Sequence, residues 1–188
     1  MINIFVGLIF VFFKTNLSFL DIGATYYLTN IIGYISILFG IIELGRTNQR
    51  LLKVRPYVMI MIAHSFIFFL LNVTGNSPLT MAFSTSLATI IAYGGLLFIV
   101  AGMFLIFAII SELLDDLNSK KNKKLLYNLI NIMMMLFILA GISAYFNMLA
   151  TTIMGTLLLL EVLFLISYYY VFLLKNENIH KRFPHQRS

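Results

Sequence analysis

The sequence predicts an all-α integral membrane protein, a bundle of about six transmembrane helices in which the first segment is short or re-entrant. Of its 188 residues, 61% are hydrophobic and only 11% are charged, a composition too apolar for a soluble domain. Apolar stretches of about 18 residues or more recur along the chain, and each is long enough to cross a bilayer as a helix. The polar stretches between them are too short to form a second domain.

Residues 1–174 are therefore expected to form one transmembrane helical domain, and residues 175–188 a basic cytoplasmic tail. The expected segments follow the apolar runs and are Ile2–Phe13, Tyr26–Leu44, Pro56–Val73, Met81–Leu114, Leu125–Phe146 and Ile153–Leu174. Proline suits the first turn of a helix, where its missing N–H has no partner to lose. Residues 74–78 have the composition of a turn.

Two of these segments depart from the length of one span. Ile2–Phe13 is short, and it has neither a preceding basic residue nor a following small-x-small cleavage site. We therefore expect it to be retained as a membrane segment that packs against the second helix, rather than removed as a signal peptide. Met81–Leu114 exceeds one bilayer thickness, so its surplus is expected to project into the cytoplasm or to be taken up by tilt.

The basic residues predict the orientation. Of the 13 lysines and arginines, four lie in residues 46–55, four in residues 120–124 and four in the tail, whereas the turns at 74–79 and 147–152 hold none. We expect a bacterial plasma membrane protein. The positive-inside rule then places both basic loops and the C-terminus on the cytoplasmic side of that membrane. The N-terminus is cytoplasmic if the first segment crosses, and outside if it does not.

Composition also narrows the function classes. The chain has no cysteine, which excludes disulfides, thiol catalysis and thiolate metal sites. Its net charge of +6 is explained by topology and by attraction to anionic lipid, so we expect the lipid bilayer, and no nucleic acid, as a partner.

The first 75 residues resemble a family of uncharacterised small bacterial multi-pass membrane proteins. The resembling positions are Gly7, Phe10, Asn16, Ile22-Gly23, Ile32-Gly33-Tyr34, Gly40, Glu43-Leu44 and Val54-Arg55-Pro56. Members carry Pro-Asp-x-Ile-Gly-Tyr at the start of the second helix, and this chain has Thr29 and Asn30 in the Pro and Asp places, which removes an acidic group. The resemblance implies a bacterial multi-pass protein and brings no assigned function with it.

Enzyme signatures are absent from the sequence. It contains no HExxH, no Gly-x-Ser-x-Gly elbow and no phosphate-binding loop. Asp115-Asp116 is a lone acidic pair next to four lysines, which is typical of a solvated helix end. We therefore expect a protein that is not an enzyme and that holds no cofactor and no metal.

Glu161 and His64 are the candidate ligand- or proton-binding residues. Glu161 lies near the middle of the sixth segment, and an ionised carboxylate in hydrocarbon is costly, so it should face the bundle interior or be protonated. It could bind a proton, a cation or another ligand, or it could be a neutral acid hydrogen-bonded between helices. His64 lies midway along the third segment, where a hydrogen-bonding role and a ligand-binding role are both open. The similar depth of the two suggests a contact between them.

Two functions remain open from the sequence. The first is a non-catalytic accessory, immunity or sensor-like membrane subunit, which fits the absence of catalytic motifs and the short loops. Such a subunit would bind a membrane-protein partner or form a homo-oligomer. The second is a small-solute transporter, or the substrate-binding subunit of a transporter, with a mid-membrane site at Glu161 and His64.

Overall fold

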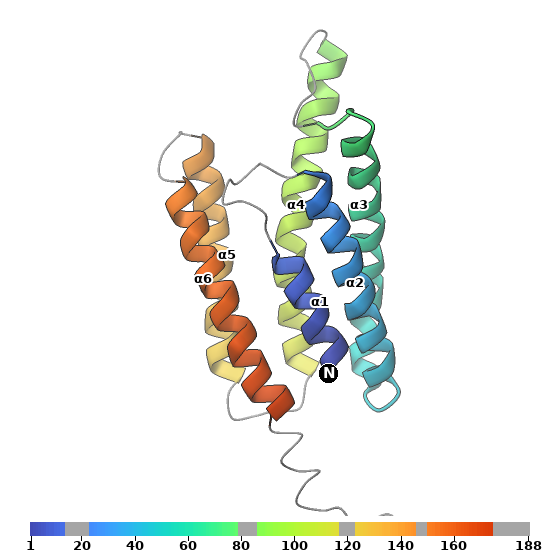
Figure 1. The fold of residues 1–188 in the computed structure, drawn as a ribbon, viewed down its shortest axis with the longest axis vertical. Coiled ribbons are helices and arrows are strands. Elements are labelled where there is room, and N and C mark those ends of the chain that lie inside the picture. Colours follow the sequence, from blue (N-terminus) through green and yellow to red (C-terminus); the bar gives the residue numbers. More distant parts are fainter. Residues whose placement is uncertain (14–22, 79–85, 117–122, 146–149, 175–188) are drawn as a thin grey trace, which may run out of the picture.

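The computed structural model describes residues 1–13, 23–78, 86–116, 123–145 and 150–174, and the described chain is helical throughout (Figure 1). Its elements are α1 (Ile2–Phe12), α2 (Ala24–Gly45), the 3₁₀ turn η1 (Gln49–Val54), α3 (Arg55–Val73), α4 (Ser86–Asp116), α5 (Lys123–Tyr145), α6 (Ala150–Tyr168) and the π-helical turn η2 (Tyr169–Leu174). The predicted all-α architecture is confirmed, and so is the position of each predicted segment to within a few residues. The predicted tail, residues 175–188, lies outside the described residues.

Five of these helices are long and apolar enough to cross a membrane. They are α2, α3 together with η1, α4, α5, and α6 together with η2. Their outward faces carry large apolar side chains such as Ile60, Leu97 and Leu159, which are 57%, 70% and 66% exposed. Exposed apolar surface on this scale is typical of helices whose surroundings are lipid.

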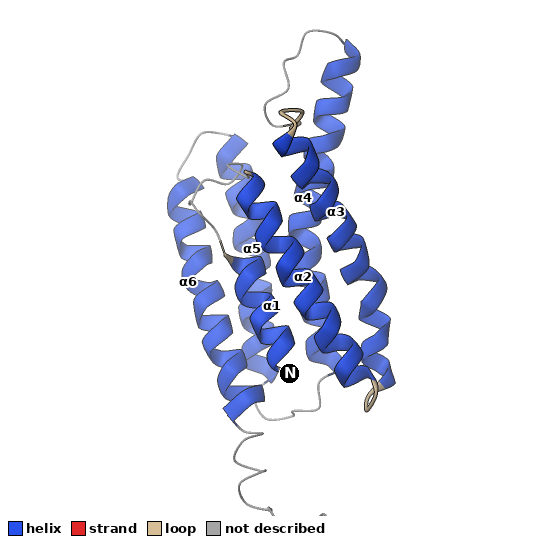
Figure 2. Ribbon diagram, turned by 45° about the vertical axis from the view of Figure 1, so that its right-hand side comes forward, coloured by secondary structure: helices blue, strands red, loops and turns tan. Residues whose placement is uncertain are grey.

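The helices form two groups with α1 and α4 between them. The hairpin of α2 and α3 lies on one side and the hairpin of α5 and α6 on the other, and this holds in both views (Figures 1 and 2). The short helix α1 packs mainly on α2 and also touches α6, and α4 contacts α3 and α5. The two groups therefore meet through α1 and α4.

All basic residues of the described chain lie at one end of the bundle, which is called the basic end here (Figure 1). They are Arg46, Arg50, Lys53, Arg55, Lys123 and Lys124. Met1 lies at the same end, although α1 has only 11 residues and is about 17 Å long, roughly half of the hydrocarbon thickness. Met1 and the basic residues of the described chain therefore share one end of the bundle.

The surplus length of α4 lies at the end opposite the basic end, where the helix extends past its neighbours (Figure 1). Of the two expectations for this surplus, projection at the basic end is wrong, and tilt stays a prediction. The reason is packing: Ile109, Ile110, Leu113 and Leu114 are buried, and the Tyr127 hydroxyl of α5 donates a hydrogen bond to Asp115. These contacts hold the C-terminal part of α4 in the bundle, so only its N-terminal part is left to project.

The turn after α3 has the geometry that its composition predicts. Gly75 adopts a φ of 73°, which favours glycine, directly after the last helical residues. The Asn76 N–H donates to the Leu71 carbonyl at 2.8 Å, and the Gly75 N–H donates to the Asn72 carbonyl at 3.2 Å. This pair of bonds is a Schellman motif, which satisfies the last carbonyls of the helix. At the other end of α3, Pro56 lies in the first turn, as predicted.

Candidate functional site

Glu161 of α6 faces the interior of the bundle, as its cost in hydrocarbon predicted. The side chain is only 3% exposed. It lies on a buried seam of α6 with the spacing of three and four residues that places side chains on one helical face. The other buried residues of this seam are Met154, Leu157, Phe164 and Tyr168.

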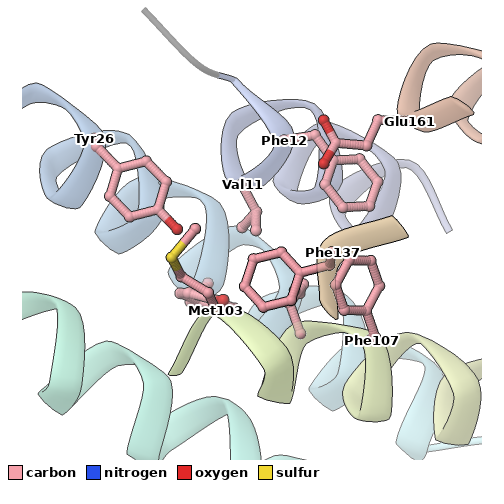
Figure 3. A pocket seen from close by; sticks show the side chains of 9 residues that line it. Val11, Phe12, Tyr26, Met103, Phe107, Phe137 and Glu161 are labelled. Atoms are coloured by element: carbon pink, nitrogen blue, oxygen red, sulfur yellow. The ribbon is translucent and has the colours of Figure 1, made fainter. Parts of the chain in front are cut away.

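A cavity lies beside the Glu161 carboxylate, at the junction of the two helical groups (Figure 3). Its lining residues come from α1, α2, α4, α5 and α6 and are Val11, Phe12, Tyr26, Tyr34, Met103, Ile106, Phe107, Phe137 and Glu161. The space open to the centre of a water molecule is about 20 Å³, which is enough for one water. The cavity is therefore the size of a water molecule or an ion, and not of a metabolite.

Polar groups from α2 face this cavity. Tyr26, Asn30 and Tyr34 recur every four residues and so lie along one face of the helix. Tyr26 and Tyr34 line the cavity, and a side-chain hydrogen bond joins Tyr26 to Asn30, which is itself buried. The sequence analysis did not single out this row of polar residues. Its four-residue spacing was the available signal.

The C-terminal end of α1 also lies at the cavity. The helix ends at Phe12, the next residue is extended, and Val11 and Phe12 line the cavity. The last turn of a helix leaves backbone carbonyls without partners in the helix and carries the negative end of the helix dipole. Backbone that ends within a membrane must be covered by protein or line a polar space. Glu161, the two tyrosines and the Val11 and Phe12 side chains near the end of α1 thus line the same cavity.

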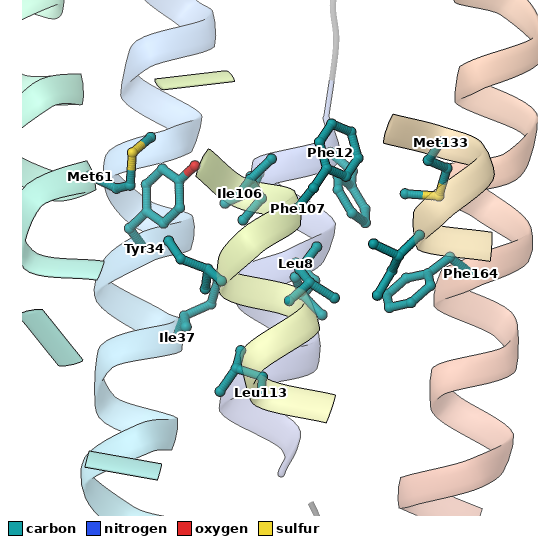
Figure 4. Packing of buried hydrophobic residues seen from close by; sticks show 14 of the residues in the cluster. Leu8, Phe12, Tyr34, Ile37, Met61, Ile106, Phe107, Leu113, Met133 and Phe164 are labelled. Atoms are coloured by element: carbon teal, nitrogen blue, oxygen red, sulfur yellow. The ribbon is translucent and has the colours of Figure 1, made fainter. Parts of the chain in front are cut away.

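An apolar layer separates this cavity from the basic end (Figure 4). Leu8 of α1, Ile37 of α2 and Phe164 of α6 each follow the cavity residues of their helices toward that end, and each is almost completely buried. Apolar side chains of α1, α2 and α6 therefore lie between Glu161 and the basic end.

His64 lies elsewhere, at the contact of α3 with α4. Its Nε2–H donates a hydrogen bond to the Phe98 carbonyl of α4 at 3.0 Å. The other ring nitrogen is Nδ1. Nδ1 is buried and has no hydrogen-bond partner within the described residues. The ring packs on Phe68, with 4.7 Å between the ring centroids, and lies directly over Gly102.

The expected contact between His64 and Glu161 is wrong. The helix α3 packs on α2 and α4, whereas α6 packs on α5 and α1, and the two lie on opposite sides of the molecule (Figure 1). Equal depth in a bundle does not make two helices neighbours, and the intervening helices separate this pair. The structure therefore brings Glu161 together with Tyr26 and Tyr34, and His64 together with Phe98 and Gly102.

Neither candidate residue forms part of a cluster of metal ligands. In the part of the chain that the structure describes, no three His, Asp or Glu side chains group closely enough to hold a metal ion between them. Comparison with known proteins found no matching family model, no matching curated protein and no matching solved structure. The function is therefore inferred from the site alone.

Proposed function

We propose that this chain is a non-catalytic, sensor-like subunit of a bacterial plasma membrane, and that it responds to the ionisation of Glu161. The observation that carries the proposal is the burial of this carboxylate at the junction of the two helical groups. Ionisation of a carboxyl group in such surroundings costs free energy that protonation avoids. A change of charge there acts on five helices at once, because α1, α2, α4, α5 and α6 all line the cavity.

The size of the cavity supports a sensor over a carrier of metabolites. Space for one water admits a proton, a water or a small ion, whereas a solute carrier requires a far larger cavity. Among the described residues that line the cavity with Glu161, the titratable ones are Tyr26 and Tyr34 of α2, and those of α1, α4 and α5 are apolar. Tyrosines ionise near pH 10, so Glu161 is the lining group that changes charge at lower pH.

A small ion-coupled transporter is the second candidate, and one observation favours it. The helix α1 ends about half-way through the bundle, beside a buried carboxylate, and interrupted helices at mid-membrane are a feature of secondary transporters. Such a protein would move an ion or solute between the two sides, so uptake into proteoliposomes distinguishes it from a sensor.

The proposal is tested by the response of the purified protein to pH. Between about pH 5 and pH 9 we expect the melting temperature of the wild type to fall as pH rises, because the ionised carboxylate is disfavoured in the cavity. The Glu161→Gln variant, which cannot ionise, should lack this dependence. Glu112→Gln is the matched control, because Glu112 is exposed on α4. A Glu161→Gln variant with the wild-type dependence on pH would overturn the proposal.

A second measurement separates a sensor from a residue that only stabilises the fold. Because the chain has no cysteine, spin labels can be attached at introduced cysteines without removing native ones. Suitable positions are Ile9 of α1 and Ile138 of α5, which are both exposed. A sensor requires the distance between the labels to change with pH in the wild type and to stay constant in Glu161→Gln. A constant distance in both proteins would reduce Glu161 to a structural role.

A further inference from the structure

We propose that the α2–α3 connection, residues 46–55, binds the phosphate headgroups of anionic phospholipids at the basic end of the bundle (Figure 1). A general attraction of the net charge to anionic lipid is expected from the sequence, whereas a site in one ordered segment is a property of the fold. The site is independent of the proposed function, because the apolar layer lies between Glu161 and the basic end.

Positive charge is concentrated in this connection and is not compensated there. Its four basic residues are all exposed, and they are Arg46, Arg50, Lys53 and Arg55. The sequence has no acidic residue between Glu43 and Glu112. Glu43, at the end of α2, accepts a hydrogen bond from the Asn3 amide of α1 at 3.0 Å. The four basic side chains form no ion pair with any residue that the structure describes, so their charge is available to a ligand.

The connection is an ordered turn with two different faces. In a 3₁₀ helix, residues three apart lie above one another. Leu51 and Val54 are such a pair, and they are buried in the core at 2% and 0% exposure. Arg50 and Lys53 are a second pair, and both are exposed. The Asn48 side chain accepts a hydrogen bond from the Arg50 N–H at 3.2 Å and so caps the turn.

Neighbouring helices hold this turn in place. It contacts α2, α3 and α4. The Leu52 side chain lies directly over Gly45, the last residue of α2, where a Cβ atom would lie 2.4 Å from Leu52 Cδ2. The positive-inside rule requires charge in a cytoplasmic loop and no fixed structure. A basic turn that is capped and packed on three helices therefore has more order than topology alone requires.

The position of the connection is that of lipid headgroups. It joins two helices that are each long enough to span, so it lies at a membrane surface. Tyr57, in the first turn of α3, is 49% exposed, and tyrosines concentrate at the interface. Ile60, one turn further, is 57% exposed and faces hydrocarbon. The exposed basic side chains thus lie at the level of the phosphates.

The chemistry of the side chains matches a phosphodiester. Three of the four basic residues are arginines, whose planar guanidinium groups donate paired hydrogen bonds to phosphate oxygens. Clusters of four to eight basic residues next to a transmembrane helix are typical of sites for anionic lipids. A lipid is also held in the plane of the bilayer, which keeps its headgroup concentrated at the connection. We therefore assign the site to a lipid headgroup and not to a soluble phosphate compound.

The test measures which lipid lies next to the connection. A fluorophore is attached at Gln49→Cys, an exposed position of η1 in a chain without native cysteine. The protein is placed in phosphatidylcholine bilayers with a small, equal fraction of spin-labelled phosphatidylglycerol or spin-labelled phosphatidylcholine as the quencher. Val73→Cys is the matched control, because this residue is 60% exposed and lies at the opposite end of α3.

At low ionic strength we expect phosphatidylglycerol to be enriched about fivefold over phosphatidylcholine at the Gln49 label, the effect of roughly one basic residue near a membrane surface. The two lipids should quench the Val73 label equally. The enrichment should fall in high salt, because exposed charges are screened. It should persist in Glu161→Gln, which separates this site from the proposed function.

Two double variants compare the position of charge with its amount. Arg50→Gln/Lys53→Gln removes two positive charges from the connection and should reduce the enrichment toward one. Lys123→Gln/Lys124→Gln removes two positive charges from α5 at the same end and should leave it unchanged. An equal loss in both variants would assign the effect to net charge and overturn the site.

Other outcomes would also overturn the proposal. Equal quenching of the Gln49 label by the two lipids at low salt would exclude a lipid site and leave an acidic protein segment as the partner of the connection. Displacement of phosphatidylglycerol by its water-soluble headgroup, glycerophosphoglycerol, would identify a soluble phosphate compound as the ligand. If Arg50→Gln/Lys53→Gln does not fold, the lipid preference and salt dependence at Gln49, compared with Val73, still decide the question.

Discussion

Gly102 is the residue that allows the His64 ring to reach the backbone of α4. A Cβ atom at position 102 would lie 2.5 Å from both Cε1 and Nε2 of that ring, closer than real Cβ contacts allow. The absence of a side chain at this position is therefore what permits the 3.0 Å hydrogen bond from Nε2 to the Phe98 carbonyl. Glycine and histidine act here as a matched pair across α3 and α4.

This pairing predicts a non-additive effect of substitution. Gly102→Ala should displace the ring and break the hydrogen bond, at a cost of about 1 kcal/mol or more in the free energy of unfolding. His64→Ala should lose the same bond without a clash. In the double variant the methyl group occupies space that the ring has left, so the loss should be smaller than the sum of the two single losses by at least about 0.5 kcal/mol. Thermal unfolding of the four proteins measures this coupling, and strict additivity would contradict it.

The sequence predicted the character of single residues better than their partners. The cost of a charge in hydrocarbon was enough to predict that Glu161 faces inward, because this depends only on the residue and its surroundings. The partners of Glu161 and His64 depend on which helices adjoin, and depth along the chain does not contain that information. Tyr26 and Tyr34 were missed for the same reason, because they become part of the site only when α2 and α6 meet at the cavity.

At the scale of elements, α1 is attached to α2 by contact between their backbones. A Cβ atom at Gly7 would lie 2.5 Å from the Gly33 carbonyl oxygen and 2.9 Å from the Ile37 nitrogen. Gly40 makes a similar approach to the Ile4 nitrogen, which would lie 3.0 Å from its Cβ atom. Small residues that let helix backbones approach closely are a common means of association within membranes. Gly33 and Gly40 are seven residues apart, so they share one face of α2, and this face receives α1.

Polar bonds at the basic end add to this attachment. The Asn3 amide donates to the Glu43 carboxylate at 3.0 Å, and the Ser36 hydroxyl donates to the Asn3 carbonyl at 2.7 Å. On the opposite side of α1, aromatic rings meet α6: Phe5 stacks on Tyr168, with 6.2 Å between the centroids, and Phe12 packs edge-on against Phe164. The helix thus has a close backbone contact on one side and an aromatic contact on the other.

Gly7→Ala should therefore be costly even though alanine is the better helix former. Two of the three nearest obstructing atoms, the Gly33 carbonyl oxygen and the Ile37 nitrogen, belong to the backbone of α2 and cannot move aside as a flexible side chain could. We expect a loss of about 1–3 kcal/mol in the free energy of unfolding, typical of overpacking. Gly94→Ala is the matched control, because a Cβ atom at that position of α4 meets nothing within 4 Å. Equal melting temperatures for the two variants would contradict the close contact of α1 with α2.

The sequence predicted elements accurately where local physics decides them. The turn after α3 and the proline in its first turn follow from backbone preferences of single residues, and both have the expected geometry. The contact of the first segment with the second helix was also correctly predicted. The surplus of α4 was assigned to the wrong end, because the end that projects depends on which part of the helix is packed, and tertiary contacts determine this.

At the scale of the whole molecule, the grouping of positive charge at the basic end predicts its orientation in a membrane. With this end in the cytoplasm, Met1 and the C-terminal end of η2 are cytoplasmic, and the turn after α3 is outside. The projecting part of α4 is then outside as well. The described structure is consistent with this arrangement because its basic residues share one end, but the charge bias is what supports the direction.

Reporter fusions test the orientation. We expect an enzyme that is active only after export to be active when fused at Ser77 and inactive when fused at Ser188, and a cytoplasmic fluorescent reporter to give the reverse. The physical reason is the cost of moving clustered lysines and arginines across the membrane. Exported activity at Ser188 would refute the proposed topology.

The shortness of α1 also has a consequence for how the protein is made. This helix is synthesised before the helices that receive it, yet at 11 residues it is too short to be held in a bilayer as a span of its own. The surfaces that receive it belong to α2, which follows it in the chain, and to α6, which is the last α-helix of the described residues. We therefore expect this segment to stay at the membrane surface until the helices that receive it are inserted. Its docking is a late step of assembly, and the cavity at Glu161 is complete only when the carboxyl-terminal hairpin has closed over it.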